Sequence, residues 1–458
     1  MMPRRVIRRN YDFPNRAVLS YNGAPQTIGL ASEAWKSLMS ISPLRAHQPA
    51  SSSGPRILIY SHDTFGLGHI RRCRAIANRL ATSFHDPSIV IISGSPVIGS
   101  FEFGDGIDYV RVPGVVKLPD GTYSTSSLSL DLEETVRIRE AIIMATARGL
   151  RPDILIVDKE PTGFRDELVQ TLQFLKEAGT RIVLGLRDVL DEPAVIVPEW
   201  QRKGALAALE RFYDEIWVYG LPQIHAPLEA FDLSPAAVRR IVYTGYIPRE
   251  LPPRPQPARY PKLTREPFVL VTTGGGGDGE ELIDWVISAY EADPSIPLGA
   301  LVVFGPFIPR ARRMAFIERI AGLPRMDAIT FDTKIEHLMH RSEGVIAMGG
   351  YNTFCEILSF DKRALIVPRR TPRLEQTIRA ERAAELGLVS MLDGAMLEPG
   401  ARRDPAMMGL AIRALAEQPL PSKSFPKGLL DGLDRIEAAT HALMTQTRIA
   451  APRDAVFA

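Results

Sequence analysis

Adjacent glycines at positions 349 and 350 stand between a short apolar run and a helix-like segment. Because Gly349 and Gly350 lack a Cβ atom, the chain can bend sharply there and let a phosphate approach the backbone. A helix that starts after this turn presents free N–H groups and the positive end of its dipole to an anion. The spacing therefore predicts a phosphate site at the turn, with Asn352 or Thr353 as the cap of the helix.

Glu356 lies three residues after Thr353, and this spacing leaves two interpretations open. At capping-box spacing, the carboxylate can bind the first turn of its own helix. Alternatively, it accepts hydrogen bonds from a ribose, as an acidic residue does in other nucleotide-binding folds. A further strand-like run and a helix that carries Gln376 follow. Together these features predict a nucleotide-sugar pocket.

A second glycine turn follows the apolar run Phe268–Val271 and comprises Gly274, Gly275, Gly276 and Gly277. Consecutive backbone N–H groups in such a turn form a nest for an anion. Four glycines in a row are costly in conformational entropy, which argues against a purely structural turn. No Gly-Lys-Ser/Thr follows, and the next strand-like run does not end in an acidic residue, so the turn is neither a Walker loop nor a dinucleotide fingerprint.

In the amino-terminal half, His69 is a candidate general base. It ends a turn that also contains Gly66 and Gly68 and that connects the apolar run Ile57–Tyr60 to a helix-like segment. An imidazole with a near-neutral pKa at such a turn is suited to removing a proton from a substrate. The alternative is a histidine that only bonds its own helix turn.

Further charged residues follow two other apolar runs. Asp158 and Glu160 come after Ile154–Val157, and Arg187 and Asp188 come after the next run. We expect them on the same rim as His69, because the carboxyl ends of parallel strands meet at one edge. A carboxylate at this rim can orient the imidazole or hold an acceptor hydroxyl, and Asp188 is the stronger candidate and Asp158 the weaker one. Arg187–Asp188 is alternatively a surface pair of little energetic value.

Short apolar runs that alternate with amphipathic stretches predict βαβ units and parallel sheets covered by helices. The strands predicted in the first half are Ile57–Tyr60, Ile89–Ile92, Ile154–Val157, Ile182–Leu186 and Ile216–Val218, with helices near 69–83, 132–149, 164–178 and 199–212. Those predicted in the second half are Phe268–Val271, Ala300–Phe304, Ala328–Phe331, Val345–Met348, Ala364–Val367 and Val389–Leu392.

The expected fold class is therefore α/β, with two doubly wound, Rossmann-like domains that face a central cleft. The predicted parts are a flexible basic arm (1–54), an amino-terminal domain (55–247), a proline-rich linker (248–266), a carboxyl-terminal domain (267–420) and a final helix and tail (421–458). The last apolar-periodic stretch, at about 426–446, can dock back onto the first domain.

Composition excludes several classes of protein. A net charge of +2 with 24% charged residues gives no overall field of the kind that nucleic-acid binders use. Cys73 and Cys355 are far apart, which supports neither a disulfide framework nor a metal site and fits the cytoplasm. No apolar run approaches the roughly 20 residues that span a bilayer. The basic arm leaves open a peripheral contact with the inner face of a membrane.

Taken together, these turns resemble those of GT-B glycosyltransferases of the family 28 (MurG-like) type, over about residues 55–420 and most closely over 343–387. The resemblance implies that Gly66, Gly68 and His69 match the amino-terminal glycine turn, whose histidine is a proposed base. It also implies donor-binding roles, which fall on Arg249, Gly274, Gly275, Gly276, Gly277, Gly349, Gly350, Thr353, Glu356 and Gln376.

Several residues depart from the family pattern. Met348, Glu375 and Arg379 stand where arginine, glutamine and asparagine are usual, and Arg187–Asp188 takes the place of a His-Glu pair. Since the first three changes fall near the expected sugar, the resemblance implies a nucleotide-sugar other than UDP-N-acetylglucosamine.

The implied activity is inverting, metal-independent transfer of a hexose from a nucleotide-sugar, with UDP as the expected nucleotide, to a hydroxyl of a glycan or lipid-linked acceptor. No Asp-X-Asp occurs in the chain, and no cofactor beyond the nucleotide-sugar co-substrate is expected. His69 and Asp188 both remain candidates for the base. The same architecture also hosts nucleotide-sugar 2-epimerases and hydrolases, and a non-catalytic nucleotide-sugar sensor is a further alternative.

Overall fold

The computed structural model describes residues 54–62, 68–117, 122–252, 260–274, 277–305, 308–332, 334–398 and 400–445. All but the last residue of the predicted basic arm lie outside these ranges. Three of the predicted site residues, Gly66, Gly275 and Gly276, also lie outside the described residues.

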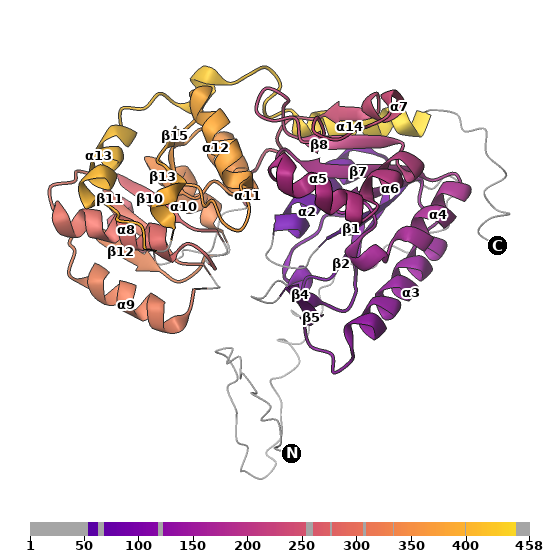
Figure 1. Cartoon of the computed structure of the whole chain (residues 1–458), viewed down its shortest axis with the longest axis horizontal. Coiled ribbons are helices and arrows are strands. Elements are labelled where there is room, and N and C mark those ends of the chain that lie inside the picture. The colour runs from indigo at the N-terminus through magenta and orange to yellow at the C-terminus, as the bar shows by residue number, and fades with distance from the viewer. Residues whose placement is uncertain are drawn as a thin grey trace, which may run out of the picture. The chain divides into compact units, whose positions relative to one another are not determined.

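The amino-terminal half is built on a seven-stranded parallel sheet with the order β3-β2-β1-β6-β7-β8-β9 (Figure 1). Its strands are β1 (Arg56–Ser61), β2 (Ser88–Ser93), β3 (Ile107–Arg111), β6 (Ile154–Asp158), β7 (Arg181–Arg187), β8 (Glu215–Tyr219) and β9 (Ile241–Tyr243). Its helices are α2 (Gly68–Ser83), α3 (Leu132–Leu150), α4 (Val169–Glu177), α5 (Pro193–Arg202), α6 (Ala205–Phe212) and α7 (Pro235–Val238). The central strands are buried along almost their whole length because helices cover both faces of the sheet.

Two predicted helices of this half are divided in the structure. The segment predicted near 199–212 forms α5 and α6, which are separated at Gly204 by a left-handed backbone conformation (φ +62°). The segment near 164–178 forms a 3-10 turn followed by α4. The edge strands β3 and β9, and the antiparallel hairpin of β4 (Val115–Lys117) and β5 (Tyr123–Thr125), were not predicted. Edge strands keep polar, half-exposed residues and so lack the continuous apolar run that marks a central strand.

The carboxyl-terminal half has a six-stranded parallel sheet with the order β12-β11-β10-β13-β14-β15. Its strands are β10 (Phe268–Thr272), β11 (Gly299–Val303), β12 (Met326–Ile329), β13 (Gly344–Ala347), β14 (Arg363–Ile366) and β15 (Ser390–Met391). Its helices are α8 (Glu280–Ala292), α9 (Arg310–Ala321), α10 (Ile335–Arg341), α11 (Tyr351–Ser359), α12 (Glu375–Glu385) and α13 (Pro405–Leu415). All six predicted strands are present, although β12 starts and ends two residues earlier than predicted and leaves Phe331 47% exposed.

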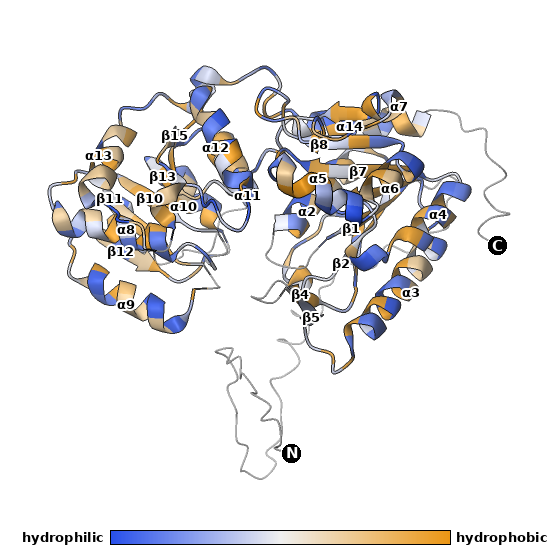
Figure 2. Cartoon of the chain, in the orientation of Figure 1, coloured by the Kyte–Doolittle hydropathy of each residue, from blue (hydrophilic) through white to orange (hydrophobic). Residues whose placement is uncertain are grey.

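Short 3-10 helices complete the described elements: η1 (Ile98–Ser100), η2 (Phe164–Asp166), η3 (Lys262–Arg265), η4 (Gly394–Leu397) and η5 (Pro421–Ser424). Figure 2 shows apolar residues gathered in the two sheets and on the inner faces of the helices, as expected for doubly wound sheets. None of the described helices combines the length and apolarity needed to cross a bilayer.

The last helix, α14 (Gly432–Thr445), packs against the amino-terminal half (Figure 1). Arg79 of α2 donates to Glu437 at 2.5 Å and to Asp434 at 2.7 Å. Ile436 and Leu443 are buried in the same core as the apolar residues of α2. After the second sheet the chain therefore returns to the amino-terminal half, where α14 packs beside α2.

Candidate functional site

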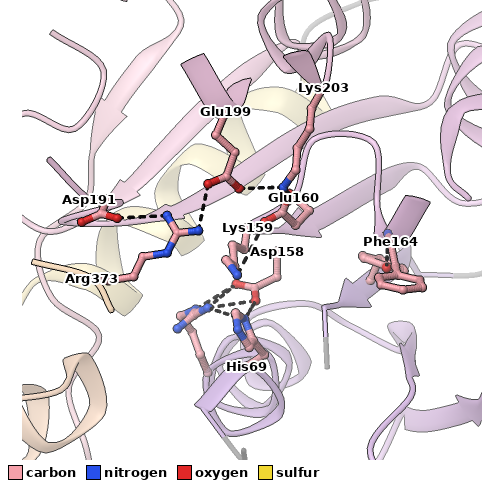
Figure 3. Close-up of polar contacts among 11 residues, drawn as sticks. His69, Asp158, Lys159, Glu160, Phe164, Asp191, Glu199, Lys203 and Arg373 are labelled. Carbon is pink, nitrogen blue, oxygen red and sulfur yellow. Dashed lines mark hydrogen bonds and ion pairs between the residues drawn. The ribbon is translucent and has the colours of Figure 1, made fainter. Parts of the chain in front are cut away.

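The start of α2 places His69 beside Asp158, the last residue of β6. β1 and β6 are neighbours in the sheet, and α2 follows β1, so both residues reach the same carboxyl edge. Nδ1 of His69 lies 2.5 Å from Oδ2 of Asp158. Figure 3 shows the two side chains facing each other. His69 therefore does not merely bond its own helix turn. It pairs with a carboxylate from another part of the chain.

Arg72 holds the Asp158 carboxylate from the other side. Its Nε and NH2 donate to Oδ1 and Oδ2, each at 2.8 Å, and both residues are buried. Burial alone would raise the pKa of Asp158, but Arg72 and His69 overcome this and hold that pKa well below its usual range. Asp158 is therefore ionised at neutral pH and acts only as an acceptor.

The tautomer of His69 follows from this charge. Because Asp158 only accepts, Nδ1 of His69 carries the proton, and Nε2 keeps its lone pair. Nε2 makes no hydrogen bond within the described ranges, and the His69 side chain is 15% exposed. Burial lowers the pKa of His69 below its ordinary value, against the opposing effect of Asp158. At neutral pH the imidazole is thus uncharged and able to accept a proton at Nε2.

His62 is a residue that the sequence analysis did not single out. It follows β1 directly, and its ring meets that of His69 edge-on at a centroid distance of 6.0 Å. Its Nδ1 is buried and has no hydrogen-bond partner in the described part of the chain, which leaves out residues 63–67. Its position in the sequence could have identified it as a candidate, since a polar residue just past the carboxyl end of a central strand lies at the ligand-binding edge.

Asp188, the second predicted candidate for the base, is placed differently. It is fully buried, and Arg379 of α12 donates to its two oxygens at 2.6 and 2.7 Å. The hydroxyl of Tyr246 donates a third hydrogen bond at 2.6 Å. Burial raises the pKa of Asp188, but Arg379 and Tyr246 reverse this and lower it. The geometry does not support Asp188 as a base, because its carboxylate is held in an ion pair away from solvent. The alternative of a surface pair between Arg187 and Asp188 is also not observed, because Asp188 is buried and binds Arg379.

The glycine turn after β13 has the conformation that its sequence requires. Gly349 has φ +76°, and a Cβ atom there would come within 2.8 Å of Ile366. Its carbonyl oxygen accepts from NH1 of Arg379 at 3.0 Å. Gly350 is the N-cap residue of α11, and no described side chain caps this helix. The predictions that Asn352 or Thr353 caps the helix, and that Glu356 completes a capping box, are therefore wrong.

The uncapped start of α11 lies against the start of α2. A Cβ atom on Gly68 would come within 2.8 Å of Nδ2 of Asn352, so a larger residue at position 68 would displace that side chain. Oδ1 of Asn352 accepts from NH2 of Arg249 at 2.7 Å. The amino terminus of α11, with free N–H groups and Arg249 beside it, thus lies against the start of α2, which is a favourable setting for an anion.

Glu356 points from α11 toward α2. Its Oε1 accepts from NH1 of Arg71 at 3.0 Å, and Arg71 also binds Glu336 at 2.5 Å. Burial raises the pKa of Glu356, and Arg71 opposes this. Within the described part of the chain, Oε2 of Glu356 and the hydroxyl of Thr353 make no hydrogen bond. Both groups therefore remain available to a ligand.

Gln376 lies near the glycine turn at the start of α11, and ion pairs connect its helix to the glycine turn after β10. Nε2 of Gln376 lies 4.0 Å from the position of a Cβ atom on Gly350, and its Oε1 accepts from the backbone N–H of Arg369 at 3.2 Å. Gly274 has φ +65° and open space around its Cβ position. Arg369 also pairs with Asp278, which follows Gly277, and with Glu375. The structure therefore connects the turn after β10 to the start of α12.

At the carboxyl edge of the amino-terminal sheet, a series of ion pairs connects this half of the chain to Arg373 of the other half (Figure 3). Arg373 binds Asp191 at 3.0 Å and Glu199 at 2.8 Å, and Glu199 in turn binds Lys203. Glu160 lies 3.4 Å from Lys203 and 3.5 Å from Lys159. Among the described residues, no group of three or more His, Cys, Asp or Glu side chains is arranged to hold a metal ion.

Comparisons with known proteins agree with this geometry. Residues 269–400 match the sequence profile of the glycosyltransferase family 28 C-terminal domain. A protein named "Uncharacterized glycosyltransferase" from Methanosarcina acetivorans is 22% identical over 316 residues, which cover 66% of this chain and 77% of that protein.

Two solved structures show the same fold at low sequence identity. MurG of Acinetobacter baumannii superposes with a TM-score of 0.53 at 13% identity, over 84% of this chain and 99% of that chain. A protein assigned as a UDP-N-acetylglucosamine 2-epimerase from Listeria monocytogenes superposes with a TM-score of 0.55 at 15% identity, over 86% of this chain and 97% of that chain.

Two parallel doubly wound sheets with their ligand-binding edges in contact define the GT-B fold, and the expected fold class is confirmed. The protein is a glycosyltransferase of this fold, and within its carboxyl-terminal half residues 269–400 match the family 28 C-terminal domain. The family resemblance inferred from the sequence is thus confirmed.

Proposed function

We propose that the protein is an inverting glycosyltransferase that moves a hexose from a UDP-sugar to a hydroxyl of a glycan or lipid-linked acceptor. The observation that carries this proposal is the His69–Asp158 hydrogen bond at the start of α2, opposite the uncapped start of α11. One element supplies a proton acceptor and the other supplies donors for an anion, which are the two groups that a displacement at an anomeric carbon requires.

In the proposed reaction, Nε2 of His69 removes the proton of the acceptor hydroxyl. The acceptor oxygen attacks the anomeric carbon from the face opposite the nucleotide, and the bond from that carbon to the diphosphate oxygen breaks. Configuration is inverted in this single displacement, and the nucleoside diphosphate leaves. Asp158 stabilises the imidazolium that forms and keeps the proton on Nδ1 of His69 before the reaction.

Negative charge that develops on the leaving diphosphate meets preorganised donors. We assign this role to the free N–H groups of α11, to the guanidinium of Arg249 and, on the family resemblance, to the glycine turn that begins at Gly274. Such donors act without reorganisation at the moment of reaction, and they supply a large part of the rate acceleration in many enzymes. We propose that they allow the transfer to proceed without a metal ion.

A UDP-sugar panel tests this function directly. Purified protein is incubated with each UDP-sugar, with and without candidate glycan acceptors, in buffer containing EDTA. We expect acceptor-dependent release of UDP, with a product of inverted anomeric configuration by NMR. Breakdown or epimerisation of the UDP-sugar at the same rate without an acceptor would instead identify the hydrolase or epimerase alternative. Loss of activity in EDTA that only a divalent ion restores would contradict the metal-free mechanism.

The proposed ribose contact of Glu356 gives a second test. Glu356→Gln should raise the Kd for UDP about tenfold, because a charged acceptor of ribose hydroxyls is replaced by a neutral one. Calorimetric titration with UDP measures the change, and a melting curve verifies that the variant is folded despite the altered contact with Arg71. Glu381→Gln, an exposed change on α12, is the matched control. An unchanged Kd in Glu356→Gln would refute the ribose assignment.

A further inference from the structure

One arginine at the carboxyl edge of the amino-terminal sheet has no partner among the residues that the structure describes. Arg187 is the last residue of β7, and its Nε is buried without a hydrogen bond. Within the described ranges its guanidinium makes no hydrogen bond or ion pair at all. A guanidinium carries five donors and is always charged, so leaving it unpaired at a partly buried position is unfavourable.

The strand register places Arg187 on the face that carries the proposed base. Asp158 of β6 lies opposite Gly185 of β7, and alternate residues of a strand point to the same face. Arg187 therefore emerges on the same face as Asp158, two residues farther toward the carboxyl edge. It pairs in register with Tyr219, whose ring also lies 5.5 Å from the guanidinium of Arg72.

The neighbouring charges are already neutralised. Arg72 is paired with Asp158, and Arg379 is paired with Asp188. Along the rim, three cations alternate with three carboxylates in one network: Arg373, Lys203 and Lys159 with Asp191, Glu199 and Glu160. Glu375 and Asp188 both favour the charged form of Arg187, but Glu375 is itself bonded to Arg369 and Asp188 to Arg379. The positive charge of Arg187 is thus left over at this edge.

We propose that Arg187 binds an oxyanion, a phosphate or a carboxylate, that the acceptor substrate carries next to its reacting hydroxyl. The inference rests on the proposed function, in which His69 contacts the acceptor. Arg187 belongs to the same sheet edge as His69, whereas the donor contacts Gly349, Gly350 and Glu356 come from the other sheet. Burial lowers the pKa of Arg187, and an incoming anion relieves that penalty by forming charge-assisted hydrogen bonds.

Anion titrations of the UDP-saturated protein test this inference. Saturating UDP occupies the donor site, after which inorganic phosphate and acetate are titrated in separate arms. We expect the wild type to bind one of these anions, and Arg187→Gln to weaken that binding at least about tenfold while the Kd for UDP changes less than about twofold. Arg187→Lys should retain part of the affinity. Arg202→Gln, which removes an exposed arginine at the end of α5, controls for net charge.

Two further arms identify the source of the oxyanion. Glucose 1-phosphate and glucuronate represent soluble acceptors, and phosphatidylglycerol vesicles represent a membrane-bound one, each compared between the wild type and Arg187→Gln. If Arg187→Gln weakens binding in only one of these arms, the ligand of that arm identifies whether the oxyanion belongs to a soluble or a membrane-bound acceptor.

Three results would overturn the inference. The first is no anion binding by the UDP-saturated wild type, and the second is equal anion binding by Arg187→Gln. The third is a large loss of UDP affinity in Arg187→Gln, which would assign Arg187 to the donor site. The same titrations are also carried out without nucleotide. If UDP does not bind the wild type, the proposed function fails, but the nucleotide-free titration still decides whether Arg187 binds an oxyanion.

Discussion

Replacing His69 with alanine should lower kcat about 10³-fold to 10⁴-fold while the Kd for UDP changes less than about threefold. The imidazole is the only group that the proposed mechanism uses to remove the acceptor proton, and within the described ranges it makes no hydrogen bond to the donor turns. The Arg72–Asp158 ion pair remains in this variant, so the fold is expected to be retained. Steady-state kinetics and UDP titration measure the two effects separately.

His85→Ala is the matched control for this experiment, because the His85 side chain is 93% exposed and lies just after α2. It should leave both kcat and the Kd for UDP unchanged. A His69→Ala variant with near wild-type kcat would exclude His69 as the base and would leave the displacement without a proton acceptor at the start of α2.

The dependence of rate on pH adds a further readout of the same pair. The base acts as neutral imidazole, so kcat/KM should fall as the pH drops through the pKa of His69, which burial places below the ordinary histidine value of 6.5. Asp158→Asn removes the carboxylate that stabilises the imidazolium, so it should lower kcat about 10²-fold to 10⁴-fold and move the acid limb to still lower pH. An acid limb that stays in place would show that Asp158 does not act on His69.

Asp188→Asn should destabilise the protein by about 3–5 kcal/mol, because it leaves the buried guanidinium of Arg379 without its counter-charge. Urea unfolding monitored by circular dichroism measures the change. Glu385→Gln breaks an exposed pair with Arg382 on the same helix and should cost less than about 1 kcal/mol. The double variant Asp188→Asn with Arg379→Met should recover part of the loss, since no unpaired charge then remains buried.

The sign of the pH dependence follows from the lowered pKa of Asp188 in the folded state. Its contribution to stability is fully present above the unfolded carboxyl pKa of about 3.9 and is lost as the pH falls through the lower folded value. If Asp188→Asn instead keeps wild-type stability and loses activity, Asp188 acts in catalysis and its assignment as a structural ion pair is wrong.

Much of the architecture could be predicted because its signals are local. The central strands of both sheets are continuous apolar runs, since helices bury both of their faces, and that pattern is visible in a window of a few residues. The glycines at 349 and 350 mark a turn that a Cβ atom would obstruct, and this requirement is also local. The edge strands and the division at Gly204 were missed, because half-exposed strands and a single helix break carry no such run.

The cap of α11 shows where local reasoning fails. Asn352 and Glu356 have the residue types and spacing of capping residues, but they bind Arg249 and Arg71 instead. Charge-assisted hydrogen bonds to side chains from a distant part of the chain outweigh the local cap. The helix amino terminus is thereby left free, which is the feature that the proposed diphosphate site needs.

The sequence by itself determined that an imidazole and two carboxylates follow central strands and that glycine turns precede helices in both halves. Only the tertiary structure decided which carboxylate serves the imidazole. β6 is the immediate neighbour of β1, at the usual strand spacing of about 4.8 Å, whereas β7 is one strand farther away. Asp158 therefore reaches His69, and Asp188 pairs with Arg379, because strand order is set by long-range packing rather than by any local pattern.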